Sequence, residues 1–236
     1  MTENKLFTKN DVMDSSQALS QVEKFIVEGL ANLSEAIKLH IPFGVTKDGK
    51  FIKYIPERCL TTYFANMLIN NGFVVFNEHS YKKITDEAGT AKLDLLARKI
   101  SPVKDEAIQL MVEAKGNQDA GYESIVADIA RMKERHLDPI IGSGFKSNKP
   151  EEEFGHRFNI VLTTDWGYKE FSTWWLDNED APSIKNHDGN TAKTRKVDCW
   201  KPLKDELRHA RRGVHHLLTN TEYNYSVNAL YAIFSK

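Results

Sequence analysis

One segment of the sequence, residues 90–117, constrains the fold most, because it reads as two β-strands joined by a polar turn. Alternate side chains of a strand point to opposite faces of the sheet. In the second strand, one face consists of Ile108, Leu110, Val112 and Ala114. The other face consists of Gln109, Met111, Glu113 and Lys115. We therefore expect the first face to lie in the core and the second to carry two charged groups at the end of the strand.

The polar turn between the two strands determines which residues face each other. The hairpin register that it favours pairs Lys99 with Ala107 or Ile108. In that register Asp94 lies opposite Glu113 or nearly so, and such neighbours are about 4.5–5.5 Å apart at their Cβ atoms. Two carboxylates this close repel each other unless a proton or a cation lies between them.

A divalent cation would remove this repulsion, since Mg²⁺ typically binds one or two protein carboxylates together with water. Lys115, on the same face as Glu113, would then lie beside a bound water or a phosphate oxygen. A structural salt bridge is the alternative, because a lone buried carboxylate is costly unless it is paired. The candidate partners of Asp94 in such a bridge are Lys92, Arg98 and Lys115.

The composition excludes several classes of protein. The chain has 236 residues, 41% hydrophobic and 28% charged, which suits one globular domain, or one domain with a helical extension. Its formal net charge of −1 means that any polyanion would need a local basic patch. The N-terminal residues resemble no secretory signal, and no apolar run approaches the roughly 20 residues of a membrane span. Cys59 and Cys199 lack metal-type spacing, which favours a reduced cytoplasmic setting.

Hydrophobic periodicity predicts the elements around the hairpin. A first helix is expected from Asp14, capped by Ser15 or Ser16 and ending before Pro42. The expected order that follows is helix (57–70), strand (73–77), strand (91–99), strand (107–115), helix (120–135) and strand (157–163). The basic residues near the end of the 120–135 helix are interpreted as a solvated helix end, with a DNA contact as the alternative, and they are Arg131, Lys133 and Arg135.

The C-terminal third is first aromatic and then basic. Phe171, Trp174 and Trp175 could stack on nucleic-acid bases, but core packing is the preferred interpretation. Residues 193–212 hold eight basic and three acidic side chains, and we expect a helix with an apolar stripe from Leu203 to Leu217. Its candidate phosphate contacts are Lys204, Arg208, Arg211 and Arg212, with an ordinary solvated face as the alternative. Residues 223–234 are expected to form a last helix or an edge strand.

This order of elements, with Asp94 in the second strand and Glu113-Ala114-Lys115 closing the third, resembles the PD-(D/E)xK nuclease superfamily. The resemblance covers residues 57–163. It implies an α/β fold with a restriction-endonuclease-like αβββαβ core, whose mixed central sheet is flanked by helices, and helical extensions at both ends. The implied domains are an N-terminal arm and helix (1–56), the nuclease-like core (57–165) and an aromatic and basic helical extension packed on the same domain (166–236).

The resemblance also implies roles for individual residues. Asp94 matches the family's first metal-binding acid, although the preceding residue is Leu93 where the family name has Pro. Glu113 matches the second acid and Lys115 the lysine, which positions or helps to deprotonate the attacking water. In the family the carbonyl between them, here that of Ala114, also faces the metal.

Two further residues match the family less closely. Glu57 lies where some members carry a helix-borne carboxylate that reaches the metal, but it also suits the first turn of a helix as a plain acid. Gln118, just after the motif, is a candidate contact to water or phosphate.

The activity that the resemblance implies is hydrolysis of phosphodiester bonds with Mg²⁺ or Mn²⁺. DNA is the favoured substrate, RNA stays open, and a homodimer would suit cutting of both strands. Two alternatives remain. The chain could be a nuclease-like module that binds nucleic acid or a protein without cutting, or an interaction protein that assembles partners through its terminal helices.

Overall fold

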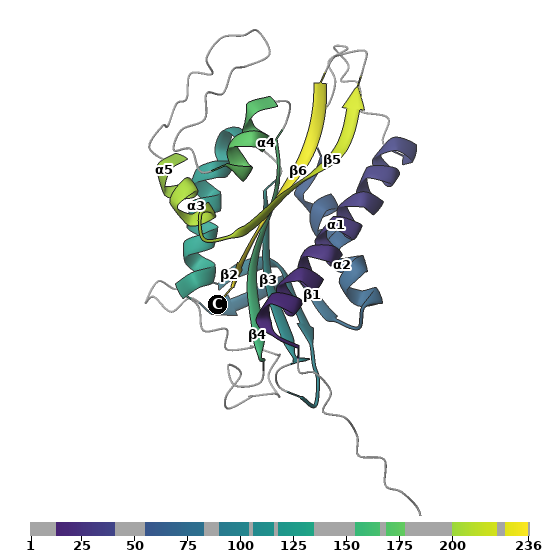
Figure 1. The fold of residues 1–236 in the computed structure, drawn as a ribbon, viewed down its shortest axis with the longest axis vertical. Coiled ribbons are helices and arrows are strands. Elements are labelled where there is room, and N and C mark those ends of the chain that lie inside the picture. The colour runs from purple at the N-terminus through teal and green to yellow at the C-terminus, as the bar shows by residue number, and fades with distance from the viewer. Residues whose placement is uncertain are drawn as a thin grey trace, which may run out of the picture.

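The computed structural model of the chain describes residues 13–40, 55–82, 90–103, 106–115, 118–134, 154–165, 169–177, 200–220 and 225–235. In this part of the chain, a six-stranded mixed sheet has helices on both faces, so the fold is of the α/β class (Figure 1). The helices α1 and α2 cover one face, and α3, α4 and α5 cover the other (Figure 1). None of these helices is long and apolar enough to cross a membrane.

The sheet has one parallel pair of strands, β3 and β4, and its other neighbours are antiparallel. Its strands are β1 (Val74–Lys82), β2 (Thr90–Lys99), β3 (Ile108–Lys115), β4 (His156–Thr164), β5 (Arg211–Asn220) and β6 (Tyr225–Ser235). They lie side by side in the order β1-β2-β3-β4-β6-β5. The helices are α1 (Ser15–His40), α2 (Glu57–Asn70), α3 (Gln118–Glu134), α4 (Lys169–Leu176) and α5 (Trp200–Leu207).

The element order expected for residues 57–163 is confirmed as α2, β1, β2, β3, α3 and β4. The hairpin register pairs Lys99 with Ile108 and Leu95 with Val112, which is one of the two expected registers. Because β3 and β4 are parallel, the chain must cross over between them, and α3 lies in that connection.

The sheet is buried on both faces, which places β3 between two apolar clusters. The face of β3 that was expected in the core packs under α1 and α2, in the cluster that also contains Val22, Leu30 and Leu60. On the other face Met111 packs with Ile125 of α3. Of the charged groups on that second face, Glu113 is therefore buried, and Lys115 at the strand end is half-buried.

The first helix begins at Ser15, and the residue that caps it is one position earlier than expected. The N–H of Gln17 donates to Asp14 Oδ1 at 2.8 Å, and the N–H of Asp14 donates to Gln17 Oε1 at 2.9 Å. This reciprocal pair is a capping box, so Asp14 caps the helix instead of Ser15 or Ser16. The helix ends at His40, before Pro42 as expected, and the N-terminal arm preceding Met13 lies outside the described residues.

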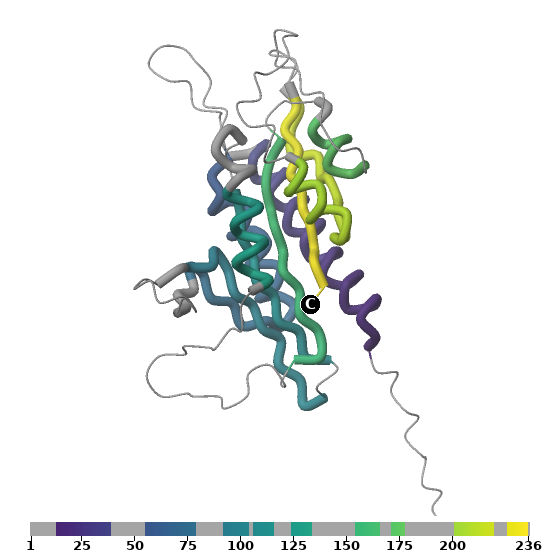
Figure 2. Tube along the Cα trace, turned by 90° about the vertical axis from the view of Figure 1, so that its left-hand side faces the viewer, coloured from purple at the N-terminus to yellow at the C-terminus, as the bar shows by residue number. Residues whose placement is uncertain are grey.

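The expectation of a helical C-terminal extension is wrong beyond Leu207, where α5 ends. Residues 211–220 and 225–235 instead form β5 and β6, and β6 lies between β4 and β5 and is not an edge strand. Figure 2 shows β6 running alongside β4 through the middle of the molecule. The apolar spacing from Leu203 to Leu217 fits a helix locally, but pairing with the sheet overrides it.

Gly213 of β5 leaves room for the Tyr231 side chain of the neighbouring strand β6. A Cβ added at Gly213 would lie 2.0 Å from Cζ of Tyr231, so only glycine lets the tyrosine ring cross β5. The ring is 5% exposed, and its hydroxyl donates to Glu23 Oε1 of α1 at 2.9 Å. Through these two contacts, the Tyr231 side chain of β6 packs across β5 and binds α1.

We expect Gly213→Ala to destabilise the protein by about 1–3 kcal/mol, the usual cost of overpacking a filled site. Tyr231 would have to move and give up its hydrogen bond to Glu23. Urea unfolding of the wild type, Gly213→Ala, Tyr231→Ala and the double variant measures this effect. The double variant should cost clearly less than the sum of the two single changes, because removing the ring removes the clash. Additive costs would contradict this explanation.

Candidate functional site

Two acids from neighbouring strands lie together where β3 ends. The N–H of Ala114 donates to Asp94 Oδ2 at 2.7 Å, so the Asp94 carboxylate reaches the backbone between Glu113 and Lys115. The Asp94 carboxylate also acts on the carboxyl group of Glu113, whose pKa it raises. The hairpin register therefore brings together residues that are nineteen positions apart in the sequence.

Glu113 is 3% exposed, and its burial dominates its protonation. Burial, and after it the charge of Asp94, raises the pKa of Glu113 to about 7. Lys115 and Arg131 act in the opposite direction, but they do not cancel the effect of burial. Near neutral pH the Glu113 carboxyl group is thus close to the midpoint of its own titration.

Helix α3 adds an acid and a base to this pair. Asp128 is 2% exposed, and its Oδ2 lies 3.0 Å from Nζ of Lys115. Its Oδ1 contacts the guanidinium of Arg131, whose Nη2 is 3.5 Å from Glu113 Oε1. The site is therefore a cluster of three acids and two bases drawn from β2, β3 and α3.

Asp128 was not identified from the sequence, although a signal was present. It lies on the buried stripe of α3, one turn after Ile125 and just before Ile129, and an acid in such a stripe needs a buried partner. Arg131 was expected at a solvated helix end. Its side chain instead reaches the sheet, where it contacts Asp128 and Glu113.

Strand β1 is irregular opposite the acid pair. The pairing of Asn77 with Leu95 and of His79 with Leu93 leaves Glu78 opposite Asp94. Glu78 has a φ of 51°, the left-handed region that non-glycine residues rarely adopt. Backbone strain of this kind gathers at functional sites, so it supports a functional role for the neighbourhood of Asp94.

The oxygen atoms of the acid pair fit a hard divalent cation. Glu113 Oε1 is buried, and no hydrogen-bond donor in the described residues reaches it. A group of three or more His, Cys, Asp or Glu side chains that could enclose a metal is not found among those residues. Two carboxylates with open positions for water are nonetheless the usual protein contribution to Mg²⁺.

The structure does not test three of the expected contacts to metal or phosphate, those of Glu57, Gln118 and the Ala114 carbonyl. Glu57 begins α2, which packs on the opposite face of the sheet from α3, and its contact with a metal stays a prediction. Gln118 begins α3, but its side chain lies outside the described residues. Ala114 meets Asp94 through its N–H, and its carbonyl as a metal ligand stays a prediction.

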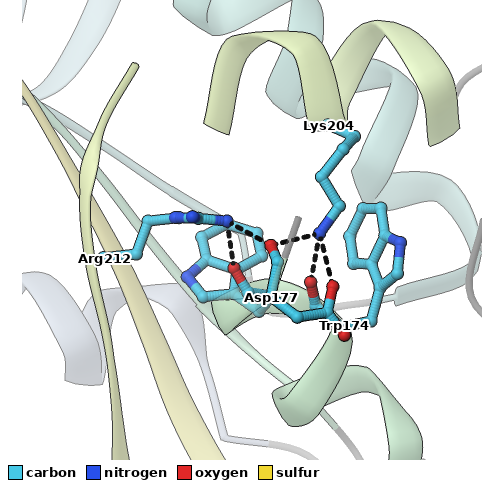
Figure 3. A network of polar contacts seen from close by, with 5 residues as sticks. Trp174, Asp177, Lys204 and Arg212 are labelled. Carbon is cyan, nitrogen blue, oxygen red and sulfur yellow. Dashed lines mark hydrogen bonds and ion pairs between the residues drawn. The ribbon is translucent and has the colours of Figure 1, made fainter. Parts of the chain in front are cut away.

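Lys204 does not present its charge to solvent, contrary to the expected phosphate contact. It is fully buried, with its ammonium donating to the carbonyl of Trp174 and, at 2.9 Å, to that of Asp177 (Figure 3). Arg212 donates to the carbonyls of Trp175 and Asp177 at 2.9 and 2.8 Å. Both cations thus stabilise the C-terminal end of α4, where the helix dipole favours positive charge.

The other two expected phosphate contacts are more exposed but have acidic partners. Arg208 donates to Asp205 at 3.0 Å and its side chain is 37% exposed. Arg211 lies on β5 and not on a helix, where its Nε is 3.0 Å from Glu23 and its side chain is 58% exposed. Their contacts to phosphate stay predictions.

The aromatic residues of α4 belong to the core, as preferred from the sequence. Phe171 and Trp175 are fully buried and Trp174 is 3% exposed. Their rings pack against one another beneath α5, with the Phe171 and Trp174 centroids 5.3 Å apart. They are therefore not placed to stack on nucleic-acid bases.

Comparisons of the chain with protein-family models, with curated proteins and with solved structures find no match. What the site can do follows from its own residues.

We expect the stability of the metal-free protein to fall as the pH rises from about 4.5 to about 7, partly because of Glu113. Its pKa is higher in the folded than in the unfolded state, so its contribution is complete below the unfolded value and is lost through the folded value. One pKa unit is worth about 1.4 kcal/mol, which limits this contribution to about 3 kcal/mol. Urea unfolding across this range in the presence of chelator measures it.

Glu113→Gln is the informative variant, since it keeps the shape of the side chain and removes its titration. Its stability should depend less on pH than that of the wild type over the same range. Glu35→Gln, whose side chain is 68% exposed and paired with Lys38, is the matched control and should leave the dependence unchanged. Equal slopes for the wild type and Glu113→Gln would contradict the assignment of the raised pKa.

Proposed function

We propose that this chain is a metal-dependent nuclease of the PD-(D/E)xK kind, which hydrolyses phosphodiester bonds in DNA. The observation that carries the proposal is the convergence of Asp94 and Glu113 at the end of β3, with Lys115 beside them. A buried, unsatisfied carboxylate oxygen next to a second acid is an unfavourable arrangement that a divalent cation would stabilise. RNA remains an alternative substrate.

In this proposal Asp94 and Glu113 hold Mg²⁺ or Mn²⁺, and the carbonyl of Ala114 is the further ligand that the resemblance suggests. The bound ion supplies a Lewis acid, which lowers the pKa of a water and neutralises charge on the phosphate. Its two positive charges would also favour the ionised form of Glu113, whose pKa is otherwise raised to about 7.

Lys115 acts on the attacking water and the phosphate. Its ammonium is 3.0 Å from Asp128, which fixes the side chain on the α3 face of the sheet. From there it can donate a hydrogen bond to the water or to a non-bridging phosphate oxygen and so stabilise the negative charge of the transition state. As the water oxygen bonds to phosphorus, one P–O bond breaks, and the proton of the water leaves to solvent or to a neighbouring base.

Binding of DNA would draw on exposed cations outside the acid pair, and Arg208 and Arg211 are our candidates. Lys204 and Arg212 are excluded from this role because their charged groups donate to backbone carbonyls at the end of α4. A homodimer would allow both strands to be cut, and the cysteine spacing favours a cytoplasmic setting.

A non-catalytic binding module is the second candidate, and one observation favours it. The pairs Lys115–Asp128 and Arg131–Glu113 already neutralise much of the acidic charge without a metal. A salt-bridge network of this kind could hold α3 on the sheet and do nothing more.

Cleavage assays separate the two candidates. We expect the wild type to cut supercoiled plasmid, linear duplex or single strands with Mg²⁺ or Mn²⁺, and to be inactive with chelator. Asp94→Ala and Lys115→Ala should each lower the rate by a factor of about 10² or more while the circular dichroism spectrum is kept. Lys92→Ala, on the same strand as Asp94 but paired with Glu78, is the control and should retain activity.

Either of two results would count against a nuclease. One is a wild type that cuts neither DNA nor RNA with any divalent ion, although it binds them with the usual salt dependence. The other is unchanged cleavage by Asp94→Ala or Lys115→Ala.

A further inference from the structure

We propose that Arg131, anchored by Asp128, is the internal counter-ion of Glu113 in the metal-free protein, and that a divalent cation displaces it toward the substrate phosphate. This inference rests on the proposed function, because it assigns the substrate contact within the same site. It adds two residues of α3 to the three that the sequence motif contains.

Asp128 divides its two oxygens between the two bases of the site. Oδ2 is 3.0 Å from Lys115 Nζ, and Oδ1 contacts the guanidinium of Arg131. Asp128 and Arg131 are one turn apart on α3, so both side chains leave the same face of the helix. Because Asp128 is 2% exposed, its carboxylate is held in place. It therefore fixes the positions of both Lys115 and Arg131 near the acids of the sheet.

The contact between Arg131 and Glu113 is loose. Nη2 lies 3.5 Å from Glu113 Oε1, and that oxygen accepts no hydrogen bond from the described residues. Arg131 Nε is likewise buried without an acceptor among them. An unsatisfied acceptor therefore lies beside an unsatisfied donor, and a cation bound at Glu113 would compete with Arg131 for the same oxygen.

Binding of a divalent ion would also change the net charge of the cluster in the direction that favours binding of a phosphate. Three acids and two bases give a formal charge of −1, and a divalent ion would change it to +1, the complement of a phosphodiester. The Arg131 side chain is 40% exposed, in contrast to its buried partners Asp128 and Glu113. A guanidinium released there can bind two oxygens of one phosphate in a bidentate manner.

Mn²⁺ binding without nucleic acid tests the first half of the inference. In isothermal titration calorimetry, Arg131→Gln should bind Mn²⁺ about tenfold more tightly than the wild type, a coupling of ordinary size between competing ligands. Arg131→Lys keeps the charge and should stay near the wild type. Lys133→Gln removes a charge from the same end of α3, where Lys133 pairs with Glu206, and should change nothing.

Binding of a short fluorescein-labelled DNA duplex in Ca²⁺ tests the second half. Arg131→Gln should bind the duplex about tenfold more weakly than the wild type. Arg131→Lys should also bind it more weakly, because lysine cannot form the bidentate contact, whereas Lys133→Gln should match the wild type.

The outcomes distinguish this inference from the proposed function. Equal Mn²⁺ affinity of the wild type and Arg131→Gln, or equal duplex affinity, would overturn the inference alone. Two other results would overturn the metal site and the inference with it. One is that Asp94→Asn leaves Mn²⁺ binding unchanged. The other is that neither the wild type nor Arg131→Gln binds Mn²⁺.

Discussion

The burial of the Glu113 carboxyl group between a sheet and a helix is the constraint on which the site depends. Both faces of β3 are covered, so water cannot solvate this group, and its pKa rises to about 7. Asp94 on one side adds a second acid, and Arg131 on the other supplies a loose counter-charge. Asp94 thus adds to the repulsion and Arg131 offsets part of it, and a divalent cation would offset it further.

The hairpin and its acid pair could be predicted from the sequence because their geometry is local. Strand alternation identified the core face of β3, and a short turn limits the register to few choices. Once Lys99 pairs with Ile108, Asp94 has to lie near Glu113. The order of elements from α2 to β4 followed from periodicity for the same reason.

The rest of the site depends on how distant elements dock, which periodicity does not encode. Asp128 and Arg131 reach the acids only because α3 lies across β3 and β4. Lys204 looked like a surface cation because basic residues surround it, yet α5 buries it against the end of α4. In residues 211–217 the apolar spacing suits a helix, but pairing with β6 makes this segment a strand.

The position of β6 has a consequence for how the protein folds. Although β5 precedes β6 in the chain, it joins the sheet only through β6, which pairs with β4 on its other side. Until β6 inserts, β5 has no strand to extend, and α1 can pack on α2 but lacks the part of its packing surface that β5 and β6 supply. Closing the sheet therefore waits for contacts between β4 and β6 that are far apart along the chain, and such non-local pairing is slow. Helix α1 would therefore complete its packing late, after β6 has paired with β4 and β5 has paired with β6.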